Sequence, residues 1–442
     1  MFGASDGMGG ARGAGGVLSA LVLLVVFLAT LTPSSDSSSA SFWCIACGEF
    51  GGLDVLNNIV LFLPLGFAFA LASGHRWRSV LACVAVTMFI ESMQVRIVAG
   101  RDASLSDLLA NSLGGLLGVE LAMRRAILVR PRGRAATILA VIGAAAFAVA
   151  TTLTSLGLRP ANIPRGLWVQ WTPERASFEP FGGKLLDFKL DTFDLPRGYY
   201  PPKSLGLDRV LARPGWHATV ELETAGARWQ RSVIARIAEE YTVLVSIEQH
   251  RWALACEEKT RSADFRFRSP QVTLPEVLTP GLAPSRLRFT CAREGRTLVA
   301  ATDDRQAVLR LSPSLGWLLL DPFKLPMPRY LWFGVLWLMA LSFPAGYWVR
   351  CSADDRAGSE ARRGALSGPS IAVGALAIAF VIGLLIVPML AGTAPAAWWE
   401  WASAAGGALA GSGAAWLWTG WAARPSIRRG GATVAAVSDP AQ

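Results

Sequence analysis

The sequence predicts an α-helical polytopic membrane protein of about eight transmembrane helices that carries an inserted, extracytoplasmic all-β sandwich domain. Of the 442 residues, 52% are hydrophobic and only 17% are charged, whereas about 25% of the residues in a soluble domain are charged. The mean hydropathy is +0.39. Long apolar runs occupy both ends of the chain, and short alternating runs occupy its middle.

The formal net charge of +10 does not indicate a nucleic-acid partner. Its arginines gather beside the apolar runs, as at Arg124, Arg125 and Arg130. Such clustering is typical of the cytoplasmic loops of membrane proteins. Nucleic-acid binding would instead require a basic patch with interleaved aromatic residues, which the sequence lacks.

The first 157 residues contain five expected spans. Residues 1–16 are rich in Gly and Ala and are expected to be disordered. The first apolar run is predicted to be an uncleaved helix, because further spans follow and no small-residue cleavage site precedes Ser34. Together, residues 17–157 form a transmembrane domain with spans near 17–33, 57–73, 79–98, 105–123 and 136–157.

Residues 160–326 differ in kind, because their apolar runs are short and alternate with polar residues. Turn residues separate these runs at roughly the 8–12-residue spacing of a β-sandwich. Strands are expected near 218–223, 232–237, 241–247, 251–255, 264–268, 285–289, 297–301 and 307–311.

Residues 328–422 supply three further spans, Tyr330–Val349, Ile371–Leu390 and Trp398–Trp421, each about the 20 residues that a bilayer requires. When the basic loops are placed in the cytoplasm, successive spans cross the membrane in consistently alternating directions. Both termini are then cytoplasmic, including the tail 423–442, and the sandwich is external.

Polar side chains interrupt the second, third and fourth spans. Placing such groups in hydrocarbon is costly unless they face one another or a wet cavity, so they are candidates for a functional site. The topology places them all toward the outer membrane face. The candidate head-group-binding residues are Asp54, Asn58, Glu91, Gln94, Arg96, Arg101, Asp107 and Asn111. Residues expected to shape helix packing are Pro64, Gly66, Gly114 and Gly118.

The ordered motifs Asp-x-x-x-Asn-x-x-x-Phe-x-Pro-x-Gly (from Asp54), Glu-x-x-Gln (from Glu91) and Asp-x-x-x-Asn-x-x-Gly-x-x-x-Gly (from Asp107) resemble the VanZ-like family over residues 17–125. The resemblance implies a small helical membrane domain in the bacterial plasma membrane. The family takes its name from a member associated with low-level resistance to the glycopeptide teicoplanin, and it implies no settled reaction. Residues 160–326 more weakly resemble a laminin-G or concanavalin-like sandwich, through the run from Trp216 to Ala255.

Three interpretations of the polar residues stay open. They are interhelical hydrogen bonds that fix helix register, a pocket for a phosphate or sugar head group, or an acid–base pair of Glu91 and Asp107. The favoured expectation is a non-enzymatic envelope protein that binds a membrane lipid, either a phospholipid or a lipid-linked glycan, while the sandwich contacts surface polysaccharide. The alternatives are a membrane enzyme or transporter for a lipid-linked phosphate or sugar, and an assembly module whose sandwich binds protein.

The cysteines and acids suggest disulfides rather than metal sites. Cys44 and Cys47 lie in the first external loop, and Cys256 and Cys291 lie in the sandwich, so both pairs are disulfide candidates. No metal or cofactor is expected. Acids between Asp187 and Asp194 could bind calcium, although solvated turn acids are the commoner explanation.

The last span carries a faint internal echo of the fourth. The run of Ala404, Gly407 and Gly411 resembles that of Asn111, Gly115 and Gly118 but lacks the acids. No clear inverted repeat is evident.

Overall fold

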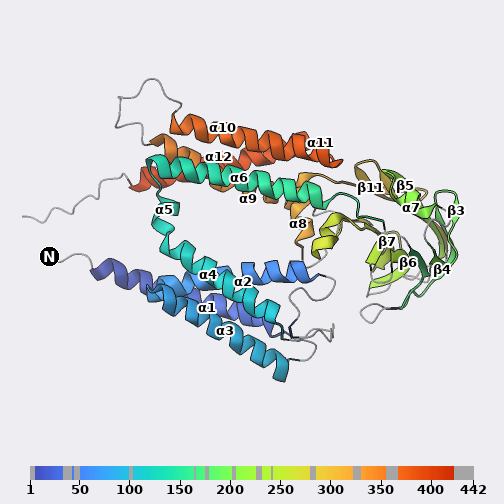
Figure 1. Cartoon of the computed structure of the whole chain (residues 1–442), viewed down its shortest axis with the longest axis horizontal. Coiled ribbons are helices and arrows are strands. Elements are labelled where there is room, and N and C mark those ends of the chain that lie inside the picture. The colour runs from blue at the N-terminus through green and yellow to red at the C-terminus, as the bar shows by residue number, and fades with distance from the viewer. Residues whose placement is uncertain are drawn as a thin grey trace, which may run out of the picture.

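The computed structural model describes two groups of helices and a β domain that lies at one end of both (Figure 1). The described residues are 5–32, 42–43, 50–98, 103–163, 166–174, 179–201, 206–224, 231–239, 242–278, 285–321, 330–354 and 367–422.

The first helical group, called bundle 1, contains the four N-terminal helices. These are α1 (Ser5–Thr30), α2 (Gly51–Ser73), α3 (Arg76–Arg96) and α4 (Leu105–Met123). Helix α1 begins at Ser5, within the segment for which the sequence predicts disorder. Once the apolar part of a helix has formed, each further residue adds one hydrogen bond, so extension toward the N-terminus costs little.

The second helical group, called bundle 2, follows the short helix α5 (Arg125–Val129). It contains α6 (Gly133–Gly157), α9 (Tyr330–Asp354), α10 (Gly368–Val381), a π-helical turn (Ile382–Ile386), α11 (Val387–Ala391) and α12 (Trp398–Ala422). Helix α5 reaches bundle 2, because Trp348 Nε1 donates a 2.8 Å hydrogen bond to the Leu128 carbonyl.

Six of the described helices are long and apolar enough to cross a membrane, so the chain is a multi-pass membrane protein. They are α1, α2, α3, α6, α9 and the continuous α10–α11. The sequence also predicts spans at α4 and α12, which are as long but less apolar, so the count of eight remains a prediction. Both helices pack closely against another helix of their own bundle, as described below.

The β domain is a sandwich of two six-stranded antiparallel sheets. Its strands are β1 (Leu167–Trp171), β2 (Lys184–Leu190), β3 (Phe193–Asp194), β4 (Gly198–Tyr200), β5 (Gly215–Glu223), β6 (Arg231–Glu239), β7 (Thr242–His250), β8 (Ala253–Glu258), β9 (Gln271–Leu274), β10 (Arg286–Glu294), β11 (Thr297–Ala301) and β12 (Gln306–Arg310). One sheet, sheet A, has the order β4-β1-β6-β7-β8-β9, and the other, sheet B, has the order β12-β11-β10-β5-β2-β3. Between them lies an apolar core that includes the fully buried Phe188, Trp216 and Phe289.

The strand expected at 264–268 is wrong. The alternating residues there end a 3-10 helix, η1 (Arg261–Phe265), and Arg266 takes a left-handed conformation with φ of 58°. This turn presents its backbone to bundle 1 instead of to a sheet, since Leu53 N donates to the Arg266 carbonyl at 3.3 Å. Period-two patterning alone cannot distinguish such a turn from a short strand.

A disulfide joins Cys256 of β8 to Cys291 of β10, and therefore links the two sheets, with a Cα–Cα distance of 5.4 Å. The cysteines are 35 positions apart. The double variant Cys256→Ala/Cys291→Ala is expected to lose roughly 4 kcal/mol of unfolding free energy, because the disulfide restricts the unfolded chain. Denaturant unfolding with and without reductant tests this. Reductant should destabilise the wild type and leave the double variant unchanged; equal stability without reductant would contradict the expectation.

The sandwich contacts both bundles. At bundle 1 the Arg268 guanidinium lies 4.1 Å from the centre of the Phe50 ring, just before α2. At bundle 2 Ala394 N, just before α12, donates to the Leu311 carbonyl at 2.8 Å. The starts of α2 and α12 therefore lie on the same side of the molecule, called the sandwich side (Figure 1).

Candidate functional site

The polar residues of α2, α3 and α4 lie toward the sandwich side of bundle 1. Asp54 lies in the first turn of α2, Asp107 lies in the first turn of α4, and Glu91 and Gln94 lie near the end of α3. Helices α2 and α4 are parallel and α3, which connects them in the chain, runs in the opposite direction, so these three ends meet. Arg101 lies outside the described residues, as do Cys44 and Cys47.

The start of α4 brings three of the predicted residues together. Ser104 caps the helix by accepting a hydrogen bond from Asp107 N at 3.0 Å, a typical role for serine. Glu91 Oε2 accepts the Ser104 N–H at 3.0 Å. Asn58 Nδ2 donates to Asp107 Oδ1 at 2.5 Å. One cap thus joins α2, α3 and α4 through two carboxylates and an amide.

Two further amides form hydrogen bonds between helices of bundle 1. Gln94 Nε2 donates to the Thr30 carbonyl of α1 at 3.0 Å, and Asn111 Nδ2 donates to Thr87 Oγ1 of α3 at 2.9 Å. Each contact joins a different pair of helices, as interhelical hydrogen bonds that fix register would. The side-chain NH2 groups of Gln94 and Asn111 therefore already hold helices together.

The acceptor atoms of the same two amides are not used. Gln94 and Asn111 are 6% and 2% exposed, and Gln94 Oε1 and Asn111 Oδ1 are buried without a hydrogen-bond partner. Leaving such an oxygen unsatisfied costs about 1–3 kcal/mol. Glu91 and Asp107 also accept hydrogen bonds when ionised. The buried part of the cluster is therefore rich in acceptors.

Asp54 and Arg96 differ from the rest of the cluster. Both side chains are exposed, Asp54 on α2 and Arg96 in the last turn of α3. The structure thus brings Asn58, Glu91 and Asp107 together at the α4 cap, places Gln94 and Asn111 at neighbouring helix contacts, and leaves Asp54 and Arg96 at the bundle surface.

Glycines set the distance between α2 and α4. A Cβ atom on Gly118 would clash with the backbone of Leu63, and one on Gly66 would clash with the backbone of Gly115. Gly114 meets Ile59 in the same way. This close approach holds Asn58 within hydrogen-bond reach of Asp107. Pro64 lies inside α2, which continues past it to Ser73.

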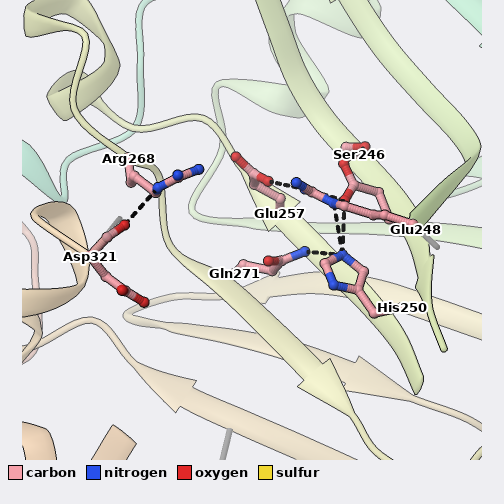
Figure 2. A network of polar contacts seen from close by, with 8 residues as sticks. Ser246, Glu248, His250, Glu257, Arg268, Gln271 and Asp321 are labelled. Carbon is pink, nitrogen blue, oxygen red and sulfur yellow. Dashed lines mark hydrogen bonds and ion pairs between the residues drawn. The ribbon is translucent and has the colours of Figure 1, made fainter. Parts of the chain in front are cut away.

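The sandwich holds a second polar cluster, which the sequence analysis missed (Figure 2). Glu248 of β7 accepts from Ser246 Oγ at 2.9 Å, lies 3.0 Å from His250 Nε2 and pairs with Arg231. Arg231 also lies 3.5 Å from Glu257 of β8. The alternation Ser246-x-Glu248-x-His250 was the available signal, because alternate residues of a strand share a face.

This second cluster belongs to a wider polar face of sheet A. The strand registers place five polar residues opposite one another on five neighbouring strands, in the order Gln170, Arg236, Ser246, Glu257 and Gln271. Near one edge of this face, the exposed rings of Trp168 and Tyr199 lie 5.0 Å apart. Exposed aromatic rings beside polar groups suit a ligand with both apolar and hydroxyl-bearing surfaces.

The acids between Asp187 and Asp194 have protein partners. Lys189 Nζ lies 3.1 Å from Asp187 and 3.3 Å from Asp194, and these carboxylates raise the pKa of the lysine. Asp191 Oδ1 accepts the His217 N–H at 2.8 Å. Among the described residues, no group of three or more His, Cys, Asp or Glu side chains could hold a metal ion.

Comparison with known proteins identifies one part of the chain. Residues 15–129 match the family model described as VanZ/LLP1. This range covers bundle 1 and α5 and includes the α4 cap. No curated protein and no solved structure matches the chain. The laminin-G or concanavalin-like resemblance of the sandwich therefore stays a prediction.

Proposed function

We propose that this protein, whose residues 15–129 form a domain of the VanZ/LLP1 family, binds the sugar head group of a glycolipid at the sandwich-side end of α2, α3 and α4. In this proposal it is a non-enzymatic protein of the bacterial plasma membrane. The sandwich and the candidate site both lie outside the cytoplasm. The disulfide between Cys256 and Cys291 supports that orientation, because disulfides persist in oxidising compartments.

The observation that carries this proposal is the excess of hydrogen-bond acceptors at the α4 cap and at the helix contacts beside it. Glu91 and Asp107 contribute carboxylates, and Gln94 and Asn111 contribute buried oxygens without partners. A sugar supplies hydroxyl donors to such a site. A phosphate head group supplies mainly acceptors, and the exposed Arg96 is the only cation of the predicted set among the described residues. A sugar therefore fits this site better than a phosphate.

The proposal is tested by native mass spectrometry of the full chain in mild detergent, with a synthetic glucosyl diacylglycerol and a phosphatidic acid of the same chain length as probes. The wild type should retain the glucosyl lipid. Asp107→Asn should weaken retention by roughly tenfold to a hundredfold, because a hydrogen bond to a charged group contributes about 1.5–3 kcal/mol.

Glu120→Gln is the matched control, since Glu120 is an acid at the opposite end of the same helix, where it pairs with Arg76 at 2.6 Å and Arg124 at 3.1 Å. This variant should retain the glucosyl lipid as the wild type does. Preference for phosphatidic acid, or equal loss of the glucosyl lipid in both variants, would contradict the proposal.

A second candidate function is contact between the sandwich and an envelope polysaccharide. The exposed Trp168–Tyr199 pair beside the polar face of sheet A favours it. Trp168→Ala should weaken co-sedimentation of the full chain with purified cell-wall sacculi by about tenfold. Trp252→Ala removes an equally exposed ring from the turn between β7 and β8 and should have no effect. Equal binding by both variants would exclude the surface around Trp168 as the polysaccharide-binding site.

A further inference from the structure

The helix pair α9–α12 of bundle 2 repeats the helix pair α2–α4 of bundle 1. Added Cβ atoms on Gly114 and Gly118 of α4 meet the backbones of Ile59 and Leu63. In bundle 2, added Cβ atoms on Gly407 and Gly411 of α12 meet the backbones of Met339 and Phe343. The reciprocal contact is repeated too, because Gly66 meets Gly115 and Gly346 meets Ala408. Corresponding residues of α2 and α9 are always the same number of positions apart in the sequence, and so are corresponding residues of α4 and α12.

Close crossings through small residues are common in membranes, so the glycines alone do not establish a repeat. Two further features agree. Pro344 of α9 stands two residues before Gly346, as Pro64 of α2 stands two residues before Gly66. In both bundles one helix, α1 or α6, precedes the parallel pair in the chain and packs against its first member. Another helix, α3 or the continuous α10–α11, connects the two members of the pair (Figure 1). The sandwich is inserted in bundle 2 at the position of the α1–α2 loop of bundle 1.

The same offset places Glu400 of α12 at the position of Asp107. The other polar positions become apolar, since Asn58 corresponds to Leu338 and Asn111 to Ala404, which are both fully buried. The sequence comparison that matched Gly407 with Gly115 was therefore wrong by one position. The statement that the last span lacks a corresponding acid was wrong too. The structural match is Gly407 with Gly114, and it brings Glu400 into register.

The corresponding site in bundle 2 is occupied by a segment of the sandwich. Glu400 is 1% exposed. Its Oε1 accepts the Ser312 hydroxyl at 2.6 Å and the Ser314 N–H at 3.3 Å, and its Oε2 accepts the Ala397 N–H at 2.6 Å. Ser312 and Ser314 follow β12 directly. A hydroxyl and an amide N–H therefore converge on one carboxylate oxygen.

We infer that bundle 2 is a second, degenerate copy of the VanZ-like unit, and that its in-chain occupant shows the ligand chemistry of the site in bundle 1. This inference rests on the proposed function and narrows it. The ligand of bundle 1 presents a hydroxyl and an amide N–H together, as an acetamido sugar does. In this inference Asp107, Gln94 Oε1 and Asn111 Oδ1 supply the acceptors for these donors.

Two synthetic lipids test the ligand class on the full chain in nanodiscs. One carries N-acetylglucosamine and the other glucose, on the same diacylglycerol. The wild type should hold the acetamido lipid about tenfold more tightly, which corresponds to one additional net hydrogen bond. Asp107→Asn should abolish this preference and Glu120→Gln should keep it.

The outcomes separate the two proposals. Binding of neither lipid would contradict the proposed function itself. Binding of both lipids with equal affinity, still dependent on Asp107, would leave the proposed function standing and overturn the ligand class.

The occupied site is tested by hydrogen–deuterium exchange. Glu400→Gln removes the charge and one of the two acceptor oxygens, so the side chain can no longer accept from Ala397 N and from the Ser312–Ser314 segment together. It should raise exchange in residues 311–317 about tenfold or more while β10 and β11 stay protected. Ser403→Ala, which removes a hydroxyl bonded within α12, should leave that segment unchanged. Unchanged exchange in Glu400→Gln would overturn the equivalence of Glu400 and Asp107.

Discussion

Replacing Gly407 with valine is expected to disrupt the crossing of α9 and α12. The new Cβ atom would clash with the Met339 backbone and the Ser342 hydroxyl. Because backbone atoms cannot move aside as a side-chain tip can, the cost should reach or exceed the upper end of the roughly 1–3 kcal/mol of ordinary overpacking. Size-exclusion chromatography and thermal unfolding of the full chain in detergent measure the loss of monodisperse, folded protein.

Gly406→Val is the control for that variant. Gly406 is the neighbouring residue of the same helix, and an added Cβ atom there meets nothing within 4 Å. The change in helix propensity is the same at both positions. Equal stability of the two variants would show that α9 and α12 do not cross at Gly407. Gly118→Val should act in the same way on bundle 1, where its Cβ atom would meet Leu63 and Phe67.

Breaking the buried ion pair of the sandwich should have a comparable effect. Arg293 Nη1 lies 2.7 Å from Glu258 Oε2, and the two side chains are 2% and 6% exposed. Arg293→Met leaves the carboxylate buried without its cation, which costs about 3–5 kcal/mol. Arg305→Met removes a surface partner of Asp304 and should change stability by no more than about 0.5 kcal/mol. Denaturant unfolding compares the two variants.

The stability of the Arg293→Met variant should also depend on pH more strongly than that of the wild type. Burial raises the pKa of Glu258, and the guanidinium of Arg293 opposes this shift. Without Arg293 the pKa rises further, so the folded state binds a proton more readily than the unfolded state does. Stability then falls as pH rises through that pKa and is partly regained on acidification. Relative to the wild type, the variant should therefore recover stability below neutral pH. A constant difference between the two proteins at every pH would contradict this account.

The sequence was sufficient for the architecture because its signals are local. Apolar length predicts the six candidate spans, and alternation predicts most of the central strands. Residues 264–268 have the period of a strand but form a turn. The positive φ of Arg266 and the hydrogen bond from Leu53 N to its carbonyl depend on packing against bundle 1. Strands β1 to β4 and β9 were missed. All but β2 have five residues or fewer, and a bulge between Leu185 and Asp187 interrupts the alternation of β2. The hydropathy of α4 is lowered by Asp107, Asn111 and Glu120, of which only Asp107 belongs to the cap.

The site was predictable as a set of residues and not as a geometry. Residue type identified Glu91, Asp107 and Asn58, but their meeting through the Ser104 cap depends on the crossing of α2 and α4. Glu248 and Glu257 of the sandwich were overlooked because they become neighbours only through strand pairing. Glu400 was overlooked because the repeat is visible in helix contacts more than in residue identity.

Binding of a sugar head group at the α4 cap can be detected by hydrogen–deuterium exchange of the wild-type protein in nanodiscs. Exchange is measured with and without the synthetic glucosyl lipid. The lipid should protect the amides of residues 104–110, where Ser104 N and Asp107 N form the cap. It should leave residues 122–129, at the other end of α4 and in α5, unchanged. Unchanged exchange at 104–110 under lipid saturation would contradict sugar binding at the α4 cap.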